Sequence, residues 1–308
     1  MRDFSCFGEN GVQIADASSS SGATLTSPSN TTTNKNAQNL VTCVYQCKLH
    51  NSSCFIITIT WTKTLMGQGL YVEIDDSSKQ SHCKLEIKPM LFIKKRGFKA
   101  LEMGSNSINF FWDLSCAKFG SSPEPIESFY FAISCNQELI LLLGDMEKEL
   151  YKKMSNVSGS PNAVFVLKKE HVFGKKVYAT TAQFCGKGQV HDVLIECDTN
   201  CTNDPCLAIR IDGKIVLQVK RLQWKFRGNY TILVDGLPVE VYWDVHSWFF
   251  GKFMGSGVFL FQTCLSAEKL WGAGSCHSAT SWSGSLIKDC AQSQGLGFSL
   301  VLCAWKNE

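Results

Sequence analysis

The sequence has no apolar run long enough to cross a membrane as a helix, and this absence argues against a helical membrane protein. Its most apolar stretch, residues 139–143, has only the length of a strand. The first residues, 1–6, carry an early acidic residue and lack the apolar core of a secretory signal. We therefore expect an intracellular protein, cytoplasmic and/or nuclear, that is not secreted and has no transmembrane segment.

Motifs of common reaction centres are also missing. The chain contains neither Gly-x-Ser-x-Gly nor a phosphate-binding loop, and its six histidines are scattered without an acid–base pair. A formal net charge of +3 over 308 residues is too small to indicate a nucleic-acid-binding protein by itself. These absences argue against an enzyme without excluding one, and no cofactor is predicted.

Cysteine is abundant, but its pattern favours neither disulfides nor a metal site. The fifteen cysteines are odd in number and no secretory route is evident, so we expect them to be reduced and mostly buried. Ligand types suited to zinc occur at Cys43, Cys47, His50 and Cys54. Two of them share a predicted strand and do not converge, so a structural role is favoured. The same holds for Cys197, Cys201 and Cys206, which flank a loop and leave a redox or metal role as the alternative.

Residues 1–38 are dominated by serine, threonine and asparagine, and they offer too little apolar surface to offset the entropy cost of ordering. We expect this segment to be disordered. After it, polar and apolar residues alternate with a period of two, as where Ile57, Ile59 and Trp61 share one face. Such strands recur at short intervals, which predicts an all-β, mostly antiparallel protein.

A long pattern occurs twice in the chain. Arg96-Gly97 is followed after fourteen residues by Trp112-Asp113, and Arg227-Gly228 is followed after fourteen residues by Trp243-Asp244. Each copy is preceded by a short strand that ends in Ile-Asp, at Asp75 and at Asp212. Repetition with constant order and spacing predicts two tandem sandwich-like modules that arose by internal duplication.

The repeat sets the predicted domain organisation. The first module spans residues 39–155 and the second spans residues 156–308, with a mobile Ser/Gly-rich loop at about 266–294. One short helix is expected between them, because Met146, Leu150 and Met154 recur at four-residue spacing after Asp145, a possible N-cap. A hairpin of residues 163–166 against 176–179 is expected to open the second module.

The repeated residues have predicted structural roles. Trp112 and Trp243 each end an alternating apolar strand, so we expect both to be anchors in the core. The strand-end aspartates, including Asp113 and Asp244, are expected to bond nearby backbone amides in turns. Calcium binding by these carboxylates is the less favoured alternative.

Both copies of the repeated hairpin are basic. The candidate residues are Lys94, Lys95 and Arg96 in the first copy, and Lys220, Arg221, Lys225 and Arg227 in the second. In residues 224–227 aromatic and cationic residues alternate, so we expect the rings to point inward and the charges outward. Such a face can attract the phosphate groups of RNA or of anionic lipid. An ordinary solvated face is the favoured alternative, because lysine and arginine also protect sheet edges.

Several stretches of the chain also resemble a plant family. They are Phe173-Gly-Lys-Lys-Val-Tyr178, Gln183-Phe-Cys185, Lys220-Arg-Leu-Gln-Trp-Lys-Phe-Arg-Gly-Asn229, Val234-Asp-Gly-Leu-Pro-Val239 and Trp243-Asp-Val-His246. The family is catalogued as a domain of unknown function (number 868), and the likeness extends from about residue 40 to the end. It implies a plant source and an intracellular protein, and it brings no activity, cofactor or catalytic residue.

Two classes of function therefore stay open. The first is a non-catalytic binding or scaffold protein that acts through β-sheet surfaces and takes a protein partner. The second is an enzyme, or a binder of carbohydrate or another small ligand, that uses a groove between the two modules. A deep groove containing polar groups with shifted pKa values favours the second class, and a flat basic face favours the first.

Overall fold

The computed structural model describes residues 37–49, 54–76, 81–88, 95–154, 159–174, 176–185, 188–198, 205–251, 255–263 and 297–306. About 68% of it is strand and about 5% is helix, which confirms the prediction of an all-β protein. The predicted disordered segment and the loop at 266–294 lie outside the described residues, except that the first strand already begins at Ala37. By their contacts, residues 35–308 form one compact unit.

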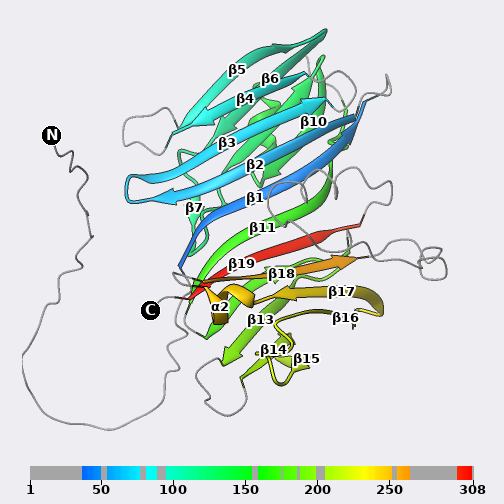
Figure 1. Ribbon diagram of the computed structural model, residues 1–308. Helices are drawn as coiled ribbons and strands as arrows, with labels where there is room; N and C mark the ends of the chain where they lie inside the picture. Colours follow the sequence, from blue (N-terminus) through cyan, green and yellow to red (C-terminus); the bar gives the residue numbers. More distant parts are fainter. Residues whose placement is uncertain are drawn as a thin grey trace, which may run out of the picture. The chain divides into compact units, whose positions relative to one another are not determined.

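The largest sheet has nine strands and contains strands from both halves of the chain (Figure 1). Its order is β16 (Arg227–Val234), β17 (Leu237–Asp244), β18 (Ser256–Thr263), β19 (Ser299–Lys306), β11 (Val164–Gly174), β1 (Ala37–Lys48), β2 (Cys54–Thr64), β3 (Gly67–Asp76) and β4 (His82–Ile87). Neighbouring strands are antiparallel except for β11 and β19, which are parallel. The sheet is therefore mostly antiparallel, as predicted.

Two four-stranded sheets accompany the large one. One has the order β10 (Glu138–Gly144), β9 (Tyr130–Cys135), β6 (Asn106–Asp113) and β5 (Arg96–Met103). The other has the order β12 (Val177–Ala182), β13 (His191–Asp198), β14 (Cys206–Ile211) and β15 (Lys214–Val219). Strands β7 (Lys118–Phe119) and β8 (Pro125–Glu127) form a small pair of their own.

The strands form where the sequence alternates. Along β2 every second residue is buried, including Ile57, Ile59 and Trp61, while the threonines between them face outward. The Asp-Gly turns after β14 and β16 place Asp212 and Asp235 at φ of 49° and 51°, in the left-handed region that such hairpins require. Local sequence therefore determines both the strands and their reversals.

Two hydrophobic cores fill the space between the sheets. The first core joins strands β2, β3 and β4 to the sheet of β5, β6, β9 and β10, and includes Phe55, Trp61 and Phe110. The second core joins β16 to β19 to the sheet of β12 to β15, and includes Phe259 and Leu300. The large sheet thus has a four-stranded sheet packed at each of its two ends.

The pairing of strands in the two halves corresponds position by position. Gly97 pairs with Trp112 and Gly228 pairs with Trp243, and both hairpins have eight consecutive pairs. The next strand then pairs in the same register, Trp112 with Phe131 and Trp243 with Phe259. From this correspondence we propose that the two halves descend from one duplicated unit. The module boundary at residues 155–156 is part of the same proposal.

Two local predictions were wrong, and one element was missed. Strands β11 and β12 do not form a hairpin: β11 pairs with β1 and β19, whereas β12 pairs with β13. Asp145 does not cap helix α1 (Glu147–Tyr151), because its carboxylate accepts the amide N–H of Phe129 instead, at 3.1 Å. A second helix, α2 (His246–Phe250), was not predicted, because five residues are too few to show a helical period.

Candidate functional site

A polar groove lies where the two halves of the chain meet on the large sheet. Its volume is about 480 Å³, and it is bounded by the β7–β8 segment, by β11 and by β12 and β13. Strands β11 and β1 lie in the middle of the large sheet, between the positions of the two smaller sheets (Figure 1). The lining residues are Ser121, Ser122, Glu124, Pro125, Ile126, Lys168, Glu170, Ala179, Thr180, Thr181 and Asp192.

Strand β11 supplies two charged residues to this groove. Lys168, Glu170 and buried Val172 occupy every second position of β11, so their side chains share one face of the strand. Val172 belongs to the second core. The Lys168 ammonium lies 2.6 Å from Glu170 Oε1, and Thr180 Oγ1 donates to Glu170 Oε2 at 2.6 Å. Glu170 is only 1% exposed, so its charge depends on these partners for compensation.

The first half of the chain contributes a second carboxylate to the same cluster. Glu124, in the loop before β8, reaches Lys168 with its Oε2 atom at 3.1 Å. Cys43 on β1 pairs with Lys168 in register, and its Sγ donates to Glu124 Oε1 at 3.3 Å. The cluster therefore links β1, β11, β12 and the β7–β8 loop through ionic and hydrogen bonds.

Neither the Cys43 thiol nor the Lys168 amine is activated as a nucleophile. Burial, assisted by the charge of Glu124, raises the pKa of the Cys43 thiol well above its usual range. Burial alone lowers the pKa of Lys168, but the Glu170 and Glu124 carboxylates outweigh it and raise that pKa above its ordinary value. A protonated thiol and a protonated amine can donate hydrogen bonds but cannot attack an electrophile.

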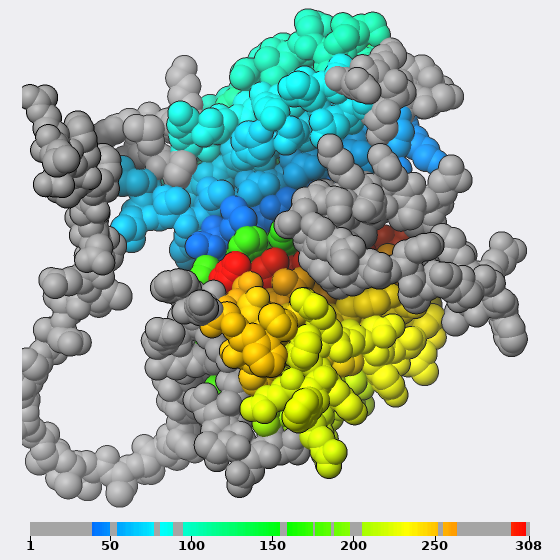
Figure 2. Space-filling view, in the orientation of Figure 1, coloured from blue at the N-terminus to red at the C-terminus, as the bar shows by residue number. Residues whose placement is uncertain are grey.

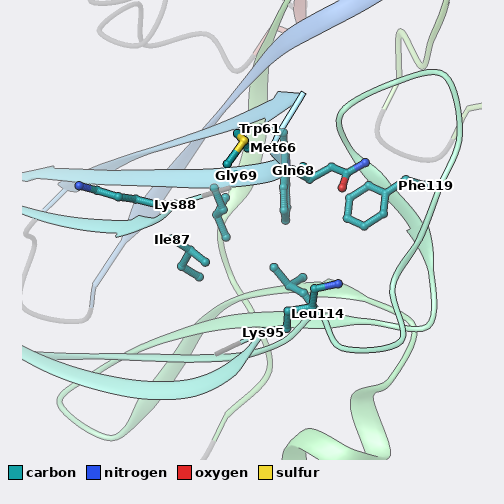
Figure 3. A pocket seen from close by; sticks show the side chains of 11 residues that line it. Trp61, Met66, Gln68, Gly69, Ile87, Lys88, Lys95, Leu114 and Phe119 are labelled. Atoms are coloured by element: carbon teal, nitrogen blue, oxygen red, sulfur yellow. The ribbon is translucent and has the colours of Figure 1, made fainter. Parts of the chain in front are cut away.

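A second, smaller cavity of about 270 Å³ lies at one end of the first core (Figure 3). Its walls are mainly apolar and include Trp61, Met66, Leu114 and Phe119. Lys88 lines it as well, but its side chain extends away from the cavity in Figure 3. Because few polar groups converge on it, this cavity specifies a ligand less well than the groove does.

The predicted basic residues fall in two separate places. Lys94 lies outside the described residues, while Lys95 and Arg96 lie at the start of β5. The residues Lys220, Arg221 and Lys225 lie between β15 and β16, and Arg227 begins β16. Strands β4 and β16 form the two opposite edges of the nine-stranded sheet, and β5 contacts β4. At about 4.8 Å between neighbouring strands, the two edges are roughly 38 Å apart. The two basic segments therefore do not join into one surface among the described residues.

The orientation predicted for residues 224–227 is wrong in one respect. Phe226 packs against the second core as expected, but Trp224 is 84% exposed. The strand begins only at Arg227, so strict alternation does not apply to the loop before it. This exposed ring changes the chemistry of the second basic segment.

The repeated Arg-Gly and Trp-Asp residues form matching sets of contacts. Trp112 and Trp243 are 9% and 7% exposed, and a Cβ on either partner glycine, Gly97 or Gly228, would overlap the indole ring. In both copies the arginine Nε lies 2.7 Å from an aspartate Oδ2, at Asp113 and at Asp244. Glycine is therefore needed opposite each tryptophan so that the ring can lie flat on the backbone.

The two aspartates also perform the expected turn chemistry. Asp113 Oδ1 accepts the amide N–H of Ser115 at 3.2 Å, and Asp244 Oδ1 accepts that of His246 at 3.0 Å. Burial alone raises the pKa of Asp113, but the hydrogen bonds from Ser115 and the contact with Arg96 together outweigh it and lower that pKa. Each aspartate thus fixes the direction in which the chain leaves its strand.

A histidine clamp lies in the second half of the chain. His191 at the start of β13 is 5% exposed, and its Nδ1 and Nε2 atoms lie 2.7 Å and 2.8 Å from the carboxylates of Asp212 and Asp235. These aspartates occupy the turns after β14 and β16, so the ring connects the small sheet to the large one. The hydrogen bond to Asp212, the largest cause, raises the pKa of His191 above its ordinary value of 6.5.

We expect His191 to make stability depend on pH. A raised pKa in the folded state stabilises fully below pH 6.5, and this contribution is lost as pH rises through the folded-state pKa. Urea unfolding at a series of pH values should show His191→Asn most destabilised near pH 5 to 6.5 and progressively closer to the parent above that. The exposed His82→Asn variant is the control, and a pH-independent difference for His191→Asn contradicts the clamp.

The groove was not identified from the sequence, although a signal for it exists. Lys168 and Glu170 occupy the inward positions of a strand, where charged residues are rare unless they are paired. Their partner Glu124 lies in a loop more than forty residues earlier, and the pairing of β11 with β1 that brings it near is not local. Only the spacing of the two charges on the strand could have pointed to the site.

Metal and membrane features add little to the site. Among the residues that the structure describes, no group of three or more histidine, cysteine, aspartate or glutamate side chains is arranged to hold a metal ion. Cys43 and Cys47 lie on β1 and bond to Glu124 and Asn162, while His50 and Cys201 lie outside the described residues. In the described parts of the chain no helix is long and apolar enough to span a membrane.

Comparison with known proteins gives one match. A family model described as "Plant protein of unknown function (DUF868)" matches residues 36–306, a range that contains all of the described residues. No curated protein matches the chain, and no solved structure does. The family resemblance found in the sequence is therefore confirmed.

Proposed function

We propose that this chain, which belongs to the plant protein family of unknown function DUF868, is a non-catalytic binding protein that holds a small polar ligand in its central groove. The single observation that carries the proposal is the buried charge cluster of Lys168, Glu170 and Glu124 on the groove floor. Ligand sites combine a concave shape with a few fixed polar groups, and this groove has both.

Binding is favoured over catalysis because of the protonation states in the cluster. The raised pKa values of Cys43 and Lys168 keep the thiol and the amine protonated, as described above. An enzyme that used either group as a nucleophile needs its pKa lowered instead. The groove thus favours the small-ligand binder that was the alternative hypothesis from the sequence, and it argues against an enzyme that uses Cys43 or Lys168 as its nucleophile.

The charge of the groove favours a ligand with a positive group. Glu124, Glu170 and Asp192 are acidic, and Lys168 is the one basic residue among the described lining residues. Glu124 is 26% exposed at its side chain and Asp192 is exposed, so both can be reached by a ligand. Serine and threonine hydroxyls beside them provide further hydrogen-bond partners.

The composition of the walls argues against a sugar as the main ligand. Among the described lining residues none is aromatic, so a sugar ring finds no flat surface on which to stack. A compact amine uses the carboxylates more completely, because charge-assisted hydrogen bonds are stronger than neutral ones. We therefore propose an amine-bearing small molecule.

Calorimetric titration with 1,4-diaminobutane tests this proposal, with glucose as a neutral hydroxylated comparator. We expect saturable binding of the diamine that weakens at least about tenfold in Glu124→Gln, because one charged partner is removed. The matched control is Glu127→Gln on β8, whose side chain is half exposed and pairs with Lys118 outside the groove. Parent and variants must share the same Tm without ligand.

The other outcomes distinguish the remaining candidates. If glucose binds and the diamine does not, the groove is a carbohydrate-binding site. If neither binds, the charge cluster serves only to hold the β7–β8 loop against β11. Equal diamine affinity in Glu124→Gln and the parent would place the binding site elsewhere.

An intracellular location is part of the proposal. All ten described cysteines are free, and five of them are buried: Cys43, Cys47, Cys83, Cys135 and Cys197. Free thiols of this number are typical of a reducing compartment. Fluorescent tagging in plant cells that shows the protein outside the cell would contradict this part.

A further inference from the structure

The loop between β15 and β16, residues 220–226, presents a single tryptophan to solvent, and we call it the Trp224 loop. Trp224 is 84% exposed, although its neighbours Leu222 and Phe226 pack into or against the second core. In Figure 2 the yellow-green part of the chain that contains this loop lies at the surface. Leu222 and Phe226 thus anchor the loop, while the Trp224 ring is exposed together with the loop's polar and charged residues.

Backbone contacts hold the Trp224 loop on both sides. The amide N–H of Leu222 donates to the carbonyl of Pro205 at 2.9 Å, and Trp243 Nε1 donates to the carbonyl of Lys225 at 2.9 Å. Within the loop, the amide N–H of Trp224 donates to the carbonyl of Arg221 at 2.9 Å. A ring that is held in position before binding loses little entropy when a partner covers it.

One residue of the loop has an unfavourable backbone conformation. Arg221 has a φ of 56°, in the left-handed region that residues other than glycine, asparagine and aspartate rarely adopt. Strain of this kind persists where the surrounding structure enforces it, and it is frequent at binding sites. It turns the chain so that Trp224 projects outward while Leu222 stays in the core.

The stretch of sequence that contains the loop carries charge of one sign. The sequence has no acidic residue between Asp212 and Asp235, whereas five basic residues lie there. They are Lys214, Lys220, Arg221, Lys225 and Arg227, of which Arg227 is paired with Asp244. Tyr230, further along β16, adds a second exposed ring at 55%. Exposed aromatic rings and cations therefore lie close together along this stretch of the chain.

We propose that the Trp224 loop binds single-stranded nucleic acid, with a base stacked on Trp224 and the neighbouring phosphates held by Lys220 and Lys225. Stacking on an aromatic ring accepts any base, and a cationic surface follows the phosphate backbone, so the pair gives binding with little sequence preference. This surface is separate from the groove, and the two proposals stand independently.

Single strands fit the loop better than a membrane surface does. Membrane binding gains from several apolar side chains that enter the lipid together. Here Leu233, also exposed, lies at the far end of the eight-residue strand β16 from the Trp224 loop. Exposed rings with cations between them along the sequence, as at Trp224, Lys225 and Tyr230, suit stacking better than insertion into lipid.

The test is fluorescence anisotropy of labelled poly(U) RNA of about 12 nucleotides, at about 50 and 200 mM salt. We expect binding that weakens at least about fivefold in Trp224→Ala and is largely retained in Trp224→Phe. The Lys220→Gln/Lys225→Gln variant should bind more weakly, and its salt dependence should fall by about one unit of slope for each phosphate that is no longer neutralised. The Tm of each variant should match the parent, because the substituted side chains are exposed.

The matched control lies in the first half of the chain. Phe98 on β5 is 59% exposed and lies beside Arg96 and Lys99, so Phe98→Ala removes an exposed ring next to cations from the other hairpin. That variant, and Lys95→Gln/Lys99→Gln, should bind RNA as the parent does. Equal weakening in both sets would indicate general attraction to polyanions and overturn the proposal.

Two further results would also overturn it. If Trp224→Ala bound RNA with the same affinity as the parent, no base would stack on Trp224. Binding of vesicles that contain phosphatidylserine, without binding of RNA, would identify a lipid surface as the partner instead.

Discussion

Replacement of Trp243 by alanine is expected to lower the free energy of unfolding by about 3–5 kcal/mol. The indole is 7% exposed, lies flat on Gly228 and donates its Nε1–H to the carbonyl of Lys225. Alanine leaves a cavity in the second core, and the glycine opposite has no side chain with which to fill it. We expect Trp112→Ala to cost a similar amount, because that ring lies on Gly97 in the same way.

Urea unfolding of the two variants measures this effect, and Trp224→Ala is the control. The exposed Trp224 should change stability by no more than about 0.5 kcal/mol, as surface substitutions usually do. Midpoints for Trp112→Ala and Trp243→Ala that equal the parent's would show that neither ring anchors a core. A large effect in one half only would argue against equivalent roles for the two tryptophans.

Replacement of Lys168 by methionine is expected to cost about 3 kcal/mol of stability. The substitution removes the ammonium that lies 2.6 Å from Glu170, a carboxylate that is 1% exposed and also accepts the hydroxyl of Thr180. A buried carboxylate without its counterion carries an uncompensated desolvation penalty.

A double variant separates charge from packing. In Lys168→Met/Glu170→Gln neither charge remains, so we expect most of the stability to return. Lys169→Met is the control, because the next residue on β11 faces the opposite side of the sheet and should have little effect. If the double variant is as unstable as the single one, Lys168 contributes by its packing and the ion pair does not matter.

The elements that the sequence predicted correctly are those governed by near neighbours. The alternation of Ile57, Ile59 and Trp61 was enough to identify β2, and the Asp-Gly pairs were enough to locate two hairpin turns. In each half of the chain the Arg-Gly pair and the Trp-Asp pair lie on the two strands of one hairpin. The residues that face one another there are at most seventeen positions apart in the sequence. Such contacts are a direct consequence of the turn between the strands.

The elements that the sequence did not predict depend on distant partners. Strand β11 has four apolar residues followed by four polar or charged ones, and nothing in this pattern shows that it pairs with β1 on one side and with the last strand on the other. The groove follows from that pairing, because it brings Cys43 opposite Lys168 and allows Glu124 to reach both. His191 was missed for the same reason, since Asp235 lies forty-four residues away.

The position of β19 beside β11 also determines the order in which the fold can be completed. Synthesis proceeds from the amino terminus, so β1 to β10 emerge first and can pair among themselves while the rest is still being made. Strand β11 then has β1 as a neighbour, but its other edge stays without a partner until residues 299–306 have been synthesised. The nascent protein thus exposes an open sheet edge for much of its synthesis, which is a liability for aggregation that only the last strand removes.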